Sequence, residues 1–151
     1  MKKNLYQERS TIWQTRKGSV EILMIFFSMI VFILIPFFIF LINILFNYTM
    51  TEYAKDCLEI SSINTYSMID FDSLGEGIIE MDPDESEKYF LENFKSLTMN
   101  DKHIADDADV SITISNANIR ILSQVTVTGL DKGSVTVHSD VGFVIDPLLE
   151  D

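Results

Sequence analysis

The chain has 151 residues, of which 47% are hydrophobic, and a formal net charge of −12 at pH 7. The charge is divided unevenly, because residues 1–17 hold five bases against one acid, whereas residues 47–151 hold 21 acids against 6 bases. An acidic second part argues against a nucleic-acid partner, because its net charge repels a phosphate backbone. The single cysteine, Cys57, excludes an intrachain disulfide and leaves an unpaired thiol or an intermolecular crosslink as alternatives.

Residues 1–18 form a short basic leader that ends in Arg16, Lys17 and Gly18. Basic residues that flank an apolar span stay in the cytoplasm. The leader therefore predicts a cytoplasmic N-terminus and an extracytoplasmic C-terminal part in a single-pass protein of the cell membrane.

Residues 22–46 form an uncharged run of 25 residues, of which 20 are Ile, Leu, Phe or Val. As a helix this run is about 38 Å long, enough to cross a hydrocarbon core of about 30 Å. It is too long for the core of a cleaved signal peptide and no small-x-small cleavage site follows it, so we expect a retained transmembrane helix in a lipid bilayer.

Pro36 predicts a kink, and Asn43 either hydrogen-bonds across a helix pair or lies near the outer interface.

Gly18, Ser19 and Glu21 stand between the basic leader and the apolar helix. In one interpretation Glu21 is an ordinary first-turn carboxylate that the helix dipole favours. In the other, Gly18 precedes a cleavage point and Glu21 pairs with a cation inside a bundle of similar helices, since a carboxylate at the edge of hydrocarbon is costly alone.

Basic residues, then Gly18, then Glu21 in the first turn of a long apolar helix, with a small β-rich domain behind, resemble a class III (prepilin-type) leader. The layout is most similar to the TadE-like minor pseudopilins of tight-adherence pilus systems. The resemblance implies cleavage by a prepilin peptidase between Gly18 and Ser19, and a new amine that pairs with Glu21 of a neighbouring subunit. It also implies that the helix packs with other pilin-like subunits in a filament, with a melted or kinked segment at Pro36. Family members usually place the glutamate fifth after the cleavage point, whereas Glu21 is third.

Helical character is expected to continue beyond the span, because Tyr53, Cys57 and Ile60 recur at spacings of four and three. We therefore expect residues 19–62 to form a transmembrane helix and stalk, and residues 63–151 to form an acidic extracytoplasmic domain.

The expected domain is α+β and pilin-like, with one helix packed on an antiparallel sheet. Residues 78–81 are interpreted as a short strand. Asp82 as N-cap and Pro83 at the first helical position predict a helix to about Leu97. Alternation from Val110 onward predicts three strands in a meander. The apolar stripe of the helix is expected to be Phe90, Leu91, Phe94 and Leu97.

We find no pattern that predicts an enzyme, a cofactor or a metal site. His103 and His138 are 35 residues apart and neither has a second ligand at metal-site spacing. The first hypothesis is thus a membrane-anchored pilin-like (TadE-like) subunit that acts in assembly of a pilus or secretion pseudopilus. The alternative is a single-pass, membrane-tethered extracytoplasmic binding or accessory module of an envelope complex.

Overall fold

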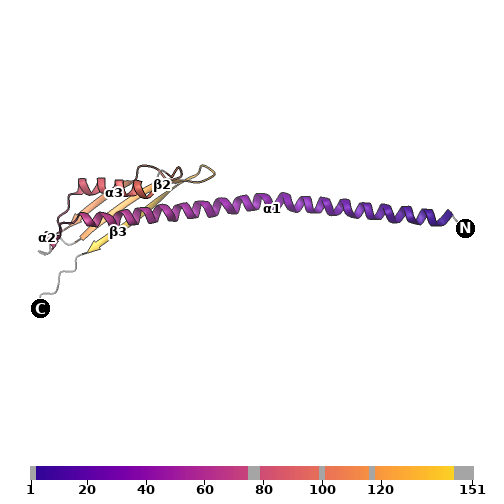
Figure 1. Cartoon of the computed structure of the whole chain (residues 1–151), viewed down its shortest axis with the longest axis horizontal. Coiled ribbons are helices and arrows are strands. Elements are labelled where there is room, and N and C mark those ends of the chain that lie inside the picture. Colours follow the sequence, from indigo (N-terminus) through magenta and orange to yellow (C-terminus); the bar gives the residue numbers. More distant parts are fainter. Residues whose placement is uncertain (1–2, 75–78, 99–100, 116–117, 145–151) are drawn as a thin grey trace, which may run out of the picture. The chain divides into compact units, whose positions relative to one another are not determined.

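The computed structural model describes residues 3–74, 79–98, 101–115 and 118–144, with side chains from residue 19 onward except at positions 71 and 74. In chain order the elements are α1 (Lys3–Thr65), the 3-10 turn η1 (Tyr66–Met68), α2 (Phe71–Leu74), α3 (Pro83–Thr98), β1 (Asp109–Ser115), β2 (Asn118–Thr128) and β3 (Ser134–Val144) (Figure 1). This layout confirms the expected α+β fold with a long N-terminal helix. The chain divides into two compact units, Met1–Ile42 and Asn43–Asp151, which we call the anchor unit and the head.

The anchor unit consists of the first part of α1. Among the described residues this is the one helix that is long and apolar enough to cross a membrane by its length and composition, and its most apolar stretch is not buried. Helix α1 continues through Pro36. The proline therefore removes one backbone hydrogen bond, to the carbonyl of Phe32, without ending the helix.

The sheet of the head, within the described part of the chain, has three antiparallel strands in the order β1-β2-β3. Its register places Ile121 opposite Ile112 on one side and Val141 on the other. Alternate β2 residues from Ile119 to Val127 are buried, and the residues between them are mostly exposed. The predicted period of two is thus confirmed, and it gives the sheet one inner and one outer face.

Helix α3 begins as its sequence predicts. The Oδ1 atom of Asp82 accepts hydrogen bonds from the backbone N–H groups of Asp84 (2.9 Å) and Glu85 (3.3 Å), which satisfies two of the donors at the helix start. Phe90 and Phe94 are fully or almost fully buried, with parallel rings 6.4 Å apart. The predicted apolar stripe therefore faces the core, with Leu91 and Leu97 half-buried at its margins.

The C-terminal part of α1 is the second helix of the core. Its buried residues are mainly small: Ala54, Cys57, Leu58, Ser61, Ser62 and Thr65. Residues 43–62, expected to be the end of the transmembrane helix and a stalk, thus belong to the head. Of the three residues whose spacing predicts this part of the helix, only Cys57 is buried, whereas Tyr53 and Ile60 are exposed. The difference arises because the buried residues are small and partly polar and carry little hydrophobic signal, so the apolar spacing does not show which face of the helix is buried.

Three contacts show how the head is arranged along α1. The phenol of Tyr53 donates a hydrogen bond of 2.7 Å to the carbonyl of Leu97 at the end of α3. At the far end of the head the rings of Tyr66 and Phe143 lie 5.4 Å apart. At the near end the loop between β2 and β3 meets α1, where a Cβ added to Gly129 would lie 2.4 Å from Oδ1 of Asn47. The strands therefore run alongside α1.

The short strand expected over residues 78–81 does not form in its described part, residues 79–81. Ile79 is buried in the core, and the carbonyl of Glu80 accepts a hydrogen bond of 3.0 Å from the N–H of Asp70. The apolar pattern there marks a buried anchor of the loop between α2 and α3, which a run of four residues cannot distinguish from a strand.

Phe90→Ala is expected to lower the free energy of unfolding of the head by about 3–5 kcal/mol, because it empties a fully buried aromatic site. Leu122→Ala, at an outer-face position that is 40% exposed, serves as the control and should cost less than about 1 kcal/mol. Urea unfolding of the full chain in detergent micelles measures both. Equal losses would contradict the assignment of the inner and outer faces.

Candidate functional sites

The first candidate site is a stripe along the apolar helix. Glu21, Ser28, Pro36 and Asn43 follow one another at intervals of 7, 8 and 7 residues. At about 100° per residue in a helix these four positions fall within an arc of about 80°. Polar side chains and a proline-freed carbonyl are the groups through which apolar helices hydrogen-bond to one another in lipid. This stripe is therefore the face of α1 best suited to bind another helix.

The structure places the predicted leader residues inside α1. Gly18 lies within the helix, and the side chains of Ser19 and Glu21 are exposed. Asn43 is half-buried. Their roles in cleavage and assembly stay predictions.

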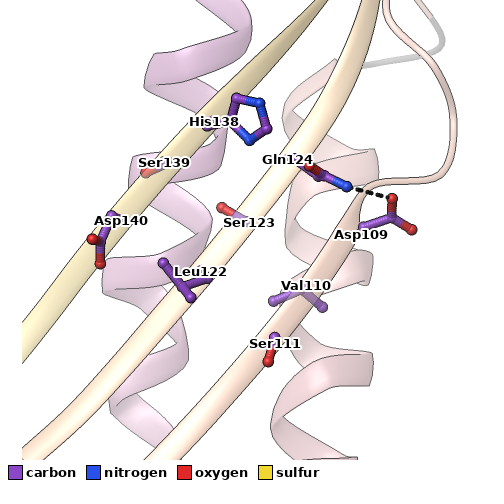
Figure 2. Close-up of a pocket in the computed structure, with 9 residues that line it drawn as sticks. All are labelled: Asp109, Val110, Ser111, Leu122, Ser123, Gln124, His138, Ser139 and Asp140. Carbon is purple, nitrogen blue, oxygen red and sulfur yellow. Dashed lines mark hydrogen bonds between the residues drawn. The ribbon is translucent and has the colours of Figure 1, made fainter.

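The second candidate site is a groove of about 400 Å³ on the outer face of the sheet. The strand register aligns Asp109, Gln124 and His138 in one row across the three strands (Figure 2). The Nε2 atom of Gln124 donates a hydrogen bond of 3.0 Å to Oδ2 of Asp109. The neutral amide thus stands between the carboxylate and the imidazole, an arrangement that can bind polar groups but does not pair an acid with a base.

The groove continues to a second row, Ser111, Leu122 and Asp140. Both α1 and α3 lie behind the strands in this view, so this face of the sheet is the one that the helices do not cover (Figure 2). Among the residues with described side chains, no cluster of three or more His, Cys, Asp or Glu residues is suited to hold a metal ion.

One ion pair lies beside the groove. The guanidinium of Arg120 donates to Asp140 through Nε (2.9 Å) and Nη2 (2.6 Å). These hydrogen bonds hold the pKa of Asp140 below its usual value. Both side chains are about half exposed, so the pair orients the two groups more than it stabilises the head.

Cys57 has no role in either site. Its thiol is buried in the core, and burial raises the pKa of the thiol, which keeps it protonated and unreactive. Of the two alternatives that the sequence left open, the native head supports the unpaired thiol, because a crosslink to another chain needs an accessible sulfur.

The sequence analysis does not predict the groove, and it predicts three residues of the stripe without the face that they share. The groove is lined by outer-face residues such as Gln124 and Leu122, which look like ordinary solvent-facing positions until the register aligns them. Glu21, Pro36 and Asn43 are each predicted as assembly residues, but the face that they share with Ser28 is hidden by the apolar residues between them.

Arg120→Gln is expected to raise the pKa of Asp140 toward the ordinary value for aspartate, because the hydrogen bonds to the carboxylate are lost. A depressed pKa stabilises the folded head above the ordinary aspartate pKa, and this contribution disappears as the pH falls through the lowered value. NMR titration of the Asp140 carboxyl measures the shift. Lys55→Gln, which removes a charge paired with Glu59 instead, should leave Asp140 unchanged, and an equal effect of both variants would contradict the assignment.

Comparison with known proteins gives no relative from which a role could be transferred. No family model matches the chain, and neither a curated protein nor a solved structure matches it.

Proposed function

We propose that the chain is a membrane-anchored pilin-like (TadE-like) subunit that acts in assembly of a pilus or secretion pseudopilus. The observation that supports this most is that α1 is exposed and apolar over residues 22–42 and carries a stripe of polar positions on one side. An apolar helix with no buried face needs lipid or other helices around it. The polar stripe favours other helices along one side.

Charge supports one orientation in the membrane. The leader holds five bases against one acid, and the acidic head follows the span. The bases stay in the cytoplasm, and the head lies on the other side of the membrane. Partners in the proposal are thus the bilayer, a prepilin peptidase on the leader side and similar subunits along the stripe.

In the leader, Gly18 marks the position at which the helix unwinds most easily. Gly18 lies inside α1, and a peptidase must unwind that turn before it can cut. Glycine is less favourable than alanine in a helix by about 1 kcal/mol, which makes this turn the easiest to open. Cleavage would leave Ser19 at the N-terminus, and its amine supplies the cation that Glu21 of a neighbouring subunit needs at the edge of hydrocarbon.

Expression together with an active prepilin peptidase is expected to remove residues 1–18, so that the mature chain begins at Ser19. Intact-mass spectrometry of the membrane fraction measures the loss. Gly18→Val should block it, because a branched side chain fills the position at which the peptidase needs glycine. The matched control is an inactive peptidase, with which both chains stay full length. An intact Met1 in the presence of active peptidase would overturn the proposed processing.

The stripe is tested by self-association. Asn43→Leu is expected to weaken association of the full chain in vesicles by roughly threefold, which corresponds to about 0.6 kcal/mol for an interhelical hydrogen bond. Fluorescence energy transfer between labelled copies of the chain measures this association. Ile44→Leu changes the neighbouring position on a different side of the helix and should have no effect. A chain that stays monomeric at every protein-to-lipid ratio would contradict the packing role.

A second candidate function, a membrane-tethered binding or accessory module, is favoured by the groove on the outer face of the sheet, in which polar groups of Asp109, Gln124 and His138 lie beside Leu122. It predicts an uncut leader and a monomeric anchor. The two experiments above therefore distinguish it from the pilin-like subunit.

A further inference from the structure

We propose that the end of the head nearest the span binds the anionic headgroups of the bilayer that α1 crosses. The binding surface consists of Lys102, Leu130 and Lys132, which we call the headgroup surface. This inference rests on the proposed membrane insertion of α1 with the head outside.

The fold brings two loops to this end of the head. The ring of His103 lies 4.8 Å from that of Phe46, and its Nδ1 is 3.0 Å from the carbonyl oxygen of Thr128, where β2 ends. Gly129, the next residue, meets Asn47 so closely that a Cβ there would collide with the asparagine. The loop of residues 101–103 and the loop of residues 129–133 are therefore held beside α1 at the position where its apolar run ends.

The depth of these two loops in the bilayer follows from the length of the apolar run, residues 22–46. Residues 22–46 cover about 38 Å, whereas the hydrocarbon core is about 30 Å thick, so each end of a centred run extends about 4 Å into the headgroup layer. Phe46 and Asn47 then lie within that layer, and the two loops that contact them lie at the same depth. Tyr48, which is 64% exposed, is of the kind that prefers this interface.

The tip of the loop between β2 and β3 presents an apolar side chain next to a basic one. Leu130 is 47% exposed and Lys132 is exposed. Lys132 has φ of 65°, a left-handed conformation that is unfavourable for a residue with a Cβ and that glycine or asparagine would adopt more easily. The turn is closed by hydrogen bonds between Gly129 and Gly133 (2.8 Å) and from Lys132 to Gly129 (3.1 Å). What the lysine adds at this strained position is its charge.

Charge distinguishes this end from the rest of the head. The two loops hold two acids and two bases, whereas the remainder of residues 47–151 holds the other 19 acids and 4 bases. Both acids stabilise their own loops: Oδ1 of Asp101 accepts from the N–H of His103 (2.9 Å) and Oδ1 of Asp131 from the N–H of Gly133 (3.1 Å). Among the described residues neither Lys102 nor Lys132 is in a salt bridge. An anionic membrane would repel the acidic remainder of the head, and these lysines are placed to bind it.

The contact between the headgroup surface and the bilayer is tested in the full chain with a polarity-sensitive fluorophore attached to single cysteines. The chain is reconstituted into phosphatidylcholine vesicles with and without phosphatidylglycerol, with lipids brominated near the headgroup as quenchers. Leu130→Cys reports the headgroup surface, and Leu122→Cys, a leucine of similar exposure on the outer face, is the matched control. Leu34→Cys reports insertion of the span. The wild-type chain, whose thiol is buried, gives the background.

We expect quenching at positions 34 and 130 and none at position 122. Lys102→Gln with Lys132→Gln should reduce quenching at position 130 in anionic vesicles to the level seen without phosphatidylglycerol. Lys88→Gln with Lys95→Gln, which removes two bases from α3, should not. Quenching at 34 but not at 130 would overturn this inference and leave the anchor intact. Loss of quenching at 34 would overturn the proposed membrane insertion as well.

Discussion

The packing of the C-terminal part of α1 against the inner face of the sheet is the contact on which the head depends. Ile119, Ile121 and Val125 are buried because Leu58 from α1 and Phe90 from α3 lie against them in one cluster. A three-stranded sheet with one helix leaves part of an apolar face in water, and the second helix removes that cost. The helix that the composition marks as a membrane anchor thus also completes the core of the domain that follows it.

This second role explains the composition of α1 beyond the span. Its buried side chains include Ser61, and the facing elements contribute Ser86, Ser123 and Ser139. Within the described part of the chain these four hydroxyl oxygens are buried without a hydrogen-bond partner. A buried hydroxyl without a partner costs about 1–3 kcal/mol, so these serines are not there for stability. Ser61 and Ser86 are fully buried and Ser123 and Ser139 nearly so, so these small side chains form part of the packed interior beside the apolar cluster.

The elements that the sequence predicts well are those with a strong local signal. The apolar run, the cap at Asp82 and the alternation of the strands each follow from residue spacing, and the structure has α3 and the three strands within a few residues of the expected bounds. The boundary of the head is different. The residues of α1 that enter the core are small and partly polar, so the pattern around Cys57 looks like a solvated stalk. Only the tertiary contacts, such as the hydrogen bond from Tyr53 to Leu97, show that it is core.

The candidate sites were harder to predict for a related reason. The groove depends on which residues the register places opposite one another, and the headgroup surface depends on two loops that meet α1 from distant parts of the sequence. Neither arrangement leaves a local pattern. The polarity of Gln124 or the turn residues around Lys132 predict only exposure, which is correct but says nothing of what they face.

The arrangement of the strands alongside α1 has a mechanical consequence. Contacts at Asn47 and Tyr53 lie along the helix, and a third, at Tyr66, lies in the 3-10 turn directly after it, at the other end of the head. A pull on α1 along its axis therefore shears all of these contacts at once, whereas a helix held at one end would be peeled away contact by contact. Tension applied to α1 is therefore passed to the whole head.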